Sequence, residues 1–158
     1  MSEVLFYHLT RSALENTLPG LLERSLARGW RAVVRVGVPE RVAAIDSHLW
    51  SYSDASFLPH GMAGDAHAAR QPVYLTAGSE MPNAPDILFL VDGAQAGTAE
   101  MAGLTRTVLI FDGRDEAALE QAREDWRRVV AAGLQAVYWA QEPGGWVEKA
   151  RAGGEAGD

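Results

Sequence analysis

The sequence contains no cysteine. This absence excludes a disulfide scaffold, a zinc site built on thiolates and a cysteine nucleophile. The opening stretch MSEVLFYHLT lacks the basic start and the long apolar run of a secretory signal, so we expect a cytoplasmic protein. The longest apolar run, from Ile87 to Val91, is far shorter than the ~20 residues that a membrane-spanning helix needs. We therefore expect no membrane association.

The chain also lacks an excess of basic residues, because its formal net charge is −7. Phosphate backbones repel such a surface, since nucleic-acid affinity comes largely from Lys and Arg that displace counterions. We therefore expect any contact with nucleic acid to be indirect, through another protein. The 47% hydrophobic and 22% charged content is that of a globular protein. The length favours one domain over residues 1–150, followed by a tail over 151–158 that has nothing to pack against.

Strand and helix patterns alternate along the chain. We expect strands over 4–9, 30–38, 73–76, 87–91, 107–111 and 134–140. We expect helices from a cap at Thr10 or Ser12 to Arg28, over 40–49 and over 115–132, with a kink or a late start at Pro19. The Gly- and Ala-rich stretch over 60–71 favours a loop. This alternation predicts an α/β domain with a largely parallel sheet that helices cover on both faces.

Motifs of nucleotide binding and of serine hydrolysis are absent: the chain has no GxxxxGK[ST], GxGxxG or GxSxG. Two strands, however, end alike, in ILFLVDG with Asp92 and in VLIFDG with Asp112. Ligands gather at the carboxyl ends of strands in open α/β sheets, and paired carboxylates there hold Mg²⁺ in phosphoryl chemistry. Asp-Gly is also ordinary turn chemistry after a strand. A metal-dependent phosphohydrolase that uses Asp92 and Asp112 is thus the alternative function.

The histidines do not form a recognisable metal site. His60 and His67 flank Asp65, but their separation matches no ligand spacing that a helix or hairpin enforces. We interpret both as solvated loop residues, and we expect neither a metal nor another cofactor.

The helix over 115–132 has an apolar stripe of Leu119, Ala122, Trp126 and Val129. Arg123 and Arg127 are four residues apart and therefore neighbours on another face. In one interpretation they pair with Glu120 and Glu124 and with the dipole at the helix C-terminus. In the other, the two arginines beside an aromatic side chain suit an acidic peptide that ends in a free carboxylate.

The stretch HLWSYSDASFLPHG, residues 48–61, is rich in aromatic residues and has no regular period. Its largest side chains, Trp50 and Phe57, are either a docking patch for another protein or a plug at the edge of the sheet.

Several fragments together carry a family resemblance. They are, in order, FYHL, GWRAVV, LWSYSDASFLPHG, QPVYL, PDILFLVDG and AREDW, and they extend from about Leu5 to Trp139. With these fragments the chain resembles the chi subunit of bacterial DNA polymerase III holoenzyme. The resemblance implies a Rossmann-like adaptor in the clamp-loader assembly, and it implies no enzymatic activity.

The resemblance also implies two binding surfaces. One receives the small psi subunit, which connects chi to the clamp loader, or a helicase; by position it consists of Trp50, Phe57, Leu58 and His60. The other binds the acidic, phenylalanine-ending C-terminal tail of single-stranded DNA-binding protein, and it consists of Arg123, Trp126 and Arg127. We expect the strand end near Phe111 and the start of the long helix to form the recess for the phenylalanine ring. Trp126 also lies on the apolar stripe, which leaves a core role open.

Overall fold

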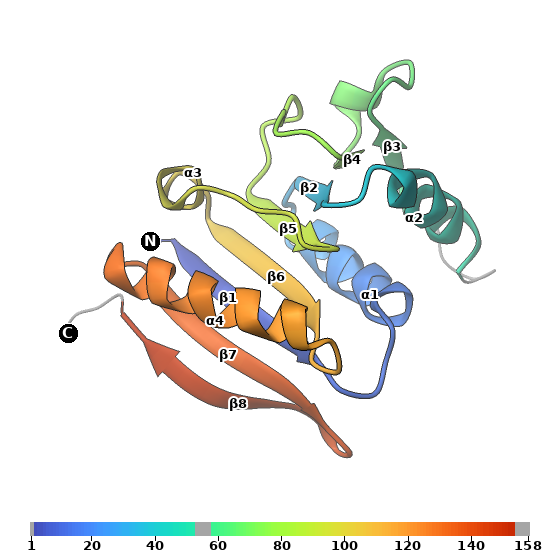
Figure 1. The fold of residues 1–158 in the computed structure, drawn as a ribbon. Coiled ribbons are helices and arrows are strands. Elements are labelled where there is room, and N and C mark those ends of the chain that lie inside the picture. Colours follow the sequence, from blue (N-terminus) through green and yellow to red (C-terminus); the bar gives the residue numbers. More distant parts are fainter. Residues whose placement is uncertain (1, 53–57, 154–158) are drawn as a thin grey trace.

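A computed structural model describes residues 2–52 and 58–153 of the chain (Figure 1). Its strands are β1 (Glu3–Leu9), β2 (Ala32–Val36), β3 (His60–Met62), β4 (Val73–Thr76), β5 (Ile87–Val91), β6 (Arg106–Asp112), β7 (Gln135–Glu142) and β8 (Gly145–Ala152). Its helices are α1 (Leu14–Ala27), α2 (Glu40–Ser51), α3 (Thr98–Ala102) and α4 (Glu116–Ala131), with a 3-10 turn at Ala68–Arg70.

The strands form one sheet in the order β3-β4-β2-β5-β6-β1-β7-β8. Neighbouring strands are parallel except β7 and β8, which are antiparallel. Buried side chains of α1 and α2 pack on one face of the sheet, and those of α3 and α4 pack on the other (Figure 1). The mostly parallel, Rossmann-like α/β fold is thus confirmed.

The start of α1 differs from the prediction. Its N-cap is Ala13, which makes no side-chain cap hydrogen bond. The predicted caps contact β7 instead: Oε1 of Gln141 accepts hydrogen bonds from the amides of Thr10, Arg11 and Ser12 at 3.2, 2.9 and 3.0 Å. Because this partner lies about 130 residues away in the sequence, local pattern reasoning did not find it.

Pro19 lies inside α1 without ending it. Proline has no amide hydrogen, so the carbonyl of Glu15, four residues earlier, loses its usual partner. Nε2 of His48, on α2, donates a hydrogen bond to that carbonyl at 2.6 Å. A side chain of the neighbouring helix therefore replaces the missing backbone hydrogen bond.

Four further elements differ from the sequence prediction. The expected loop over 60–71 contains β3 and the 3-10 turn, and neither α3 nor β8 was expected. β8 is an edge strand whose residues are mostly exposed, so it lacks the apolar pattern of a buried strand. It includes Arg151 and Ala152, which the sequence analysis placed in the tail; residues 154–158 lie outside the described residues.

Candidate functional site

The long helix α4 begins at a well-formed cap. The carboxylate of Asp115 accepts hydrogen bonds from the amides of Ala117 and Ala118, at 3.0 and 3.3 Å. Ala122 and Val129 of the helix are buried, as the apolar stripe predicts, and Val129 packs into the core on this face of the sheet. Trp126, on the same stripe, is only partly buried. It is therefore part of the packing and part of the surface.

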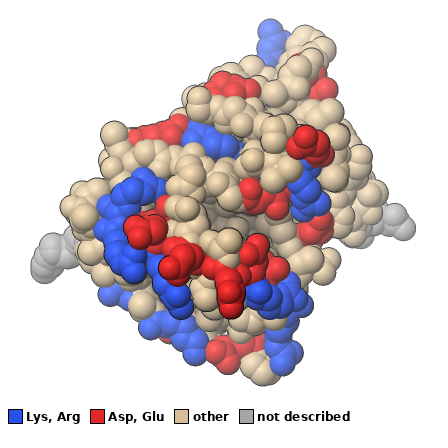
Figure 2. Space-filling model, viewed as in Figure 1, with Lys and Arg blue, Asp and Glu red and all other residues tan. Residues whose placement is uncertain are grey.

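Arg123 and Arg127 lie on the exposed part of α4, with side chains 59% and 66% exposed. Each forms an ion pair with the glutamate three residues earlier, Arg123 with Glu120 at 3.4 Å and Arg127 with Glu124 at 2.9 Å. Figure 2 shows acidic and basic side chains side by side over this face of the molecule. Exposed pairs of this kind stabilise by only ~0–1 kcal/mol, so exchanging the glutamates for another carboxylate costs little.

Aromatic side chains gather under α4 where it crosses β1 and β7. We call this group the aromatic cluster; its members are Phe6, His8, Phe111, Trp126 and Tyr138. Trp126 packs edge-on against Phe6, with ring centres 5.3 Å apart, and against Tyr138 at 6.0 Å. Phe111 is 6.0 Å from Tyr138 and 5.2 Å from His8. Phe6 is fully buried, whereas the other members are partly exposed, so the cluster ends in an apolar surface.

Strand register explains the aromatic cluster. In the sheet Phe6 pairs with Tyr138, and His8 pairs with Phe111, so rings from three strands meet on the α4 face. Nδ1 of His8 and the hydroxyl of Tyr138 share a hydrogen bond of 2.8 Å. The sequence analysis did not select His8 or Tyr138 as site residues, because only the pairing of β1 with β7 brings them to Trp126.

Burial and nearby charges shift the pKa values of His8 and Tyr138 in the aromatic cluster. Burial lowers the pKa of His8, and the nearby Asp112 carboxylate opposes that shift. Burial raises the pKa of Tyr138, and the positive charge of Arg123 opposes it. Arg123 is thus close enough to Tyr138 for its charge to act on the edge of the aromatic cluster.

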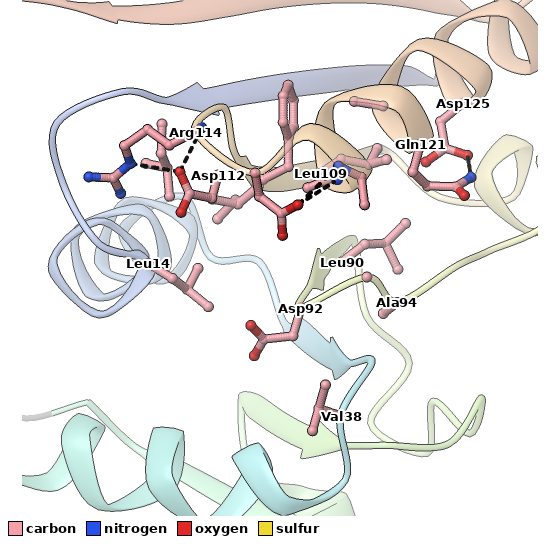
Figure 3. Close-up of a pocket in the computed structure, with 18 of the residues that line it drawn as sticks. Leu14, Val38, Leu90, Asp92, Ala94, Leu109, Asp112, Arg114, Gln121 and Asp125 are labelled. Atoms are coloured by element: carbon pink, nitrogen blue, oxygen red, sulfur yellow. Dashed lines mark hydrogen bonds and ion pairs between the residues drawn. The ribbon is translucent and has the colours of Figure 1, made fainter.

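The opposite flank of α4 borders a cavity of about 630 Å³, which we call the α4 cavity (Figure 3). Its apolar lining includes Leu14, Val38, Leu90, Leu109 and Ala122. Its acidic lining consists of Glu15, Asp92, Asp112, Asp115 and Asp125, against the single basic residue Arg114. This surface does not suit an acidic peptide.

Asp92 and Asp112 both line the α4 cavity, so the predicted strand-end carboxylates do come to one site. Figure 3 shows Asp112 beside Arg114 on one wall and Asp92 on the other, near Val38. Nε of Arg114 donates to Asp112 at 2.8 Å and lowers the pKa of that carboxyl. Nε of Arg41 donates to Asp92 at 3.2 Å. Each carboxylate is therefore already engaged by a guanidinium.

Within residues 2–52 and 58–153, no group of three or more His, Asp or Glu side chains is arranged to hold a metal ion. The geometry therefore does not favour the phosphohydrolase alternative. None of the helices in the same residues is long and apolar enough to cross a membrane.

The second predicted surface lies at the end of α2. The sequence suggested an irregular stretch at Trp50. The helix instead extends to Ser51, so Trp50 is helical. Its side chain is 54% exposed and its ring centre is 4.3 Å from that of His60. Leu58 and His60 are buried, at 1% and 3% exposure, and Phe57 lies outside the described residues. Of the three described residues of this predicted surface, Trp50 is therefore the exposed one.

His60 corrects the prediction of a solvated histidine. It belongs to β3, and its Nδ1 donates to the carbonyl of Leu58 at 2.7 Å, while Nε2 is 3.1 Å from a carboxylate oxygen of Asp46. The error followed from interpreting 60–71 as a loop. His67 is exposed, as predicted.

Comparison with known proteins gives two matches. Residues 1–137 match the family model described as "DNA polymerase III chi subunit, HolC". A curated relative, "Probable DNA polymerase III subunit chi" from Rickettsia prowazekii (strain Madrid E), is 25% identical over 91 residues. Those residues cover 58% of this chain and 55% of the relative, so the match spans about half the length of that relative.

Proposed function

The chain belongs to the family of the DNA polymerase III chi subunit, and from this we propose that it is a non-catalytic adaptor in cytoplasmic DNA replication. In this role it links the clamp loader to single-stranded DNA-binding protein by binding the acidic C-terminal tail of that protein. Nucleic acid is then reached through the bound partner, in keeping with the formal net charge of −7.

The observation that carries the proposal is the placement of cations beside the aromatic cluster. A tail that ends in phenylalanine needs an apolar recess for its ring and positive charges for its carboxylates. The exposed edges of Trp126 and of Phe111, which also borders the α4 cavity, offer the apolar surface, and Arg123 and Arg127 offer the charges. Arginine suits this role because its planar fork makes two parallel hydrogen bonds to one carboxylate.

The α4 cavity supports the same assignment by contrast. Three arginines (Arg41, Arg114 and Arg128) pair with four of its five carboxylates, which leaves a net charge of −2, so the flank of α4 that faces β7 is the better place for an acidic tail. The same carboxylates give no support for catalysis, since Asp92 and Asp112 are each bound by an arginine.

For the connection to the clamp loader we propose the surface around Trp50, which receives a psi subunit or a helicase. Among the described residues the exposed large apolar side chains are Val38, Trp50 and Val147, and Trp50 is the aromatic one. Exposed tryptophans are enriched among the residues that dominate binding energy at interfaces. The ring of the buried His60 packs against that of Trp50, with ring centres 4.3 Å apart.

Calorimetry with a synthetic tail peptide tests the proposal. The full-length chain should bind an acidic peptide that ends in phenylalanine, and it should bind much less of the same peptide without that residue. Equal binding of both peptides would contradict an aromatic recess. Capture from a lysate, scored for single-stranded DNA-binding protein and clamp-loader components, tests the adaptor role in the cell.

A further inference from the structure

A second, smaller cavity lies on the face of the sheet opposite α4. It measures about 140 Å³ and is bordered by the end of α1, by β1 and by β6. We call it the arginine cavity, because its lining includes Arg24, Arg28 and Arg106 together with Tyr7 and Trp30. Its arginines come from two elements that are far apart in the sequence, so helix composition alone does not account for the group.

Trp30 holds two of the guanidinium groups. The guanidinium carbon of Arg28 is 4.9 Å from the centre of the Trp30 ring, and that of Arg106 is 5.1 Å from it. Cation–π contact of this kind restricts where a long side chain points. Glu3 fixes Arg106 further, since its carboxylate accepts a hydrogen bond from Nε at 2.6 Å. These two guanidinium groups are therefore held in place without a ligand.

The arginine cavity has an excess of positive charge. Among the ion pairs of residues 2–52 and 58–153, Glu3 pairs with Arg106, but no carboxylate pairs with Arg24 or Arg28. Three guanidinium groups against one carboxylate leave a net local charge of +2, in a chain whose formal net charge is −7. The C-terminal dipole of α1 favours Arg24 and Arg28, but it does not explain why Arg106 joins them.

The electrostatics of Tyr7 agree with this placement. Burial raises the pKa of the Tyr7 hydroxyl, and three positive charges act in the opposite direction. In order of decreasing effect, these charges belong to Arg106, Arg24 and Arg28. All three guanidinium groups are thus near the wall of the same cavity.

We propose that the arginine cavity binds a phosphate group. A carboxylate has two oxygens, and one guanidinium fork satisfies both. Arg106 already has such a partner in the carboxylate of Glu3. A phosphate has more acceptor oxygens than one fork can use, and as a monoester it carries a charge of about −1.5 to −2 at pH 7. That charge matches the local excess of the cavity, whereas a phosphodiester of DNA carries a single negative charge and neutralises half of it.

Two sources supply this group: a phosphate of single-stranded DNA, or free phosphate and small phosphate esters. The DNA source rests on the proposed function, because a chain held on single-stranded DNA-binding protein lies beside the strand. Three cationic contacts give only weak binding at physiological salt, so the isolated chain should bind naked DNA poorly. When the chain is held on the protein that covers the strand, an effective concentration of about 1 mM raises the occupancy of such a site.

Nuclear magnetic resonance titration of the full-length, ¹⁵N-labelled chain tests the proposal. Inorganic phosphate and a short oligothymidylate are added separately at low salt, up to about 10 mM in phosphate groups, with chloride of equal ionic strength as the baseline. The reporter is the indole N–H of Trp30. The variants are Arg24→Gln and Arg28→Gln. The matched control is Arg70→Gln, which removes the same charge from an exposed residue beside β4.

We expect saturable shifts of the Trp30 resonance, with affinity about tenfold lower in Arg24→Gln or Arg28→Gln and unchanged in Arg70→Gln. Shifts with phosphate alone identify small phosphate compounds as the ligand, and tighter binding of the oligonucleotide than of phosphate, at equal concentration of phosphate groups, identifies DNA. The absence of saturable shifts with either probe overturns the proposal, and so does an equal loss of affinity in the control variant. Binding of the tail peptide uses the opposite face of the sheet, so either proposal can fail without the other.

Discussion

The two flanks of α4 present opposite chemistry although they belong to one helix. Toward β7, Trp126 joins the aromatic cluster and Arg123 places its charge near Tyr138. Toward β5, Gln121 and Asp125 line the α4 cavity, whose lining combines apolar side chains with five carboxylates (Figure 3). An acidic ligand therefore has one flank available to it, and the difference follows from which strands lie beneath each side of the helix.

The largest expected effect comes from removing the support of the aromatic cluster. Phe6→Ala empties a fully buried position under Trp126, and Phe-to-Ala changes in cores cost about 3–5 kcal/mol of unfolding free energy. Urea unfolding measures this loss. Phe89→Ala is the matched control, because Phe89 is equally buried but belongs to the other side of the sheet. Both variants should lose stability, and only Phe6→Ala should also weaken tail binding by the folded protein; equal weakening would contradict the local role of the aromatic cluster.

The next effect concerns the charges on the flank that faces β7. Arg123→Ala should lower the affinity for the tail peptide at least tenfold, which is ~1.4 kcal/mol, because one charged contact is lost. Arg127→Ala should cost less, and both effects should shrink as salt rises. Calorimetry measures them. Arg114→Ala, on the opposite flank, is the control and should leave the affinity unchanged. Arg123→Ala with wild-type affinity would remove Arg123 from the site.

A smaller effect on stability is expected at the Trp50 surface. Trp50→Ala should change the unfolding free energy by less than about 1 kcal/mol, because half of the side chain is already exposed. Trp50→Ala should nevertheless lower the affinity for a psi subunit or a helicase. Leu49→Ala is the neighbouring control and should cost about 2–5 kcal/mol, since Leu49 is buried. A large fall in the melting temperature of Trp50→Ala would show that Trp50 is a core residue. Phe57 lies outside the described residues, and its substitution stays a prediction. Phe57→Ala should cost little unfolding free energy and should lower the affinity for the partner.

The smallest effect is a dependence on pH through His8. Burial lowers the pKa of His8 below the usual 6.5, so the folded state binds a proton less readily than the unfolded chain. Its contribution to stability is therefore complete above pH ~6.5 and is lost as pH falls through the folded-state pKa. His8→Gln, which keeps a polar partner for Tyr138, should lose less stability than the wild type over that range. If the unfolding free energy of the wild type and of His8→Gln changes equally with pH, His8 does not contribute to the pH dependence of stability.

Sequence reasoning was most reliable where periodicity is strong. The stripe of α4 and the apolar runs of β4 and β5 have the expected positions. It was least reliable where a long-range contact decides the structure. β8 is exposed and lacks an apolar pattern, and β3 buries His60 through pairing with β4.

The candidate site shows the same division. Arg123, Arg127 and Trp126 were assigned to the site from their spacing on one helix together with the family resemblance, and their role in binding stays a prediction. His8 and Tyr138 were not, because their contact joins residues 130 positions apart in the sequence. No local pattern in either strand indicates that the two side chains meet.

The most direct test of the central claim uses the tryptophans of the chain as internal reporters. The indole N–H resonances of Trp30, Trp50 and Trp126 are followed while the acidic, phenylalanine-ending peptide is added to the ¹⁵N-labelled protein. These residues lie in the arginine cavity, at the end of α2 and on α4. We expect a saturable shift of the Trp126 resonance, with those of Trp50 and Trp30 unchanged. A shift of Trp50 or Trp30 with Trp126 unchanged would contradict this expectation.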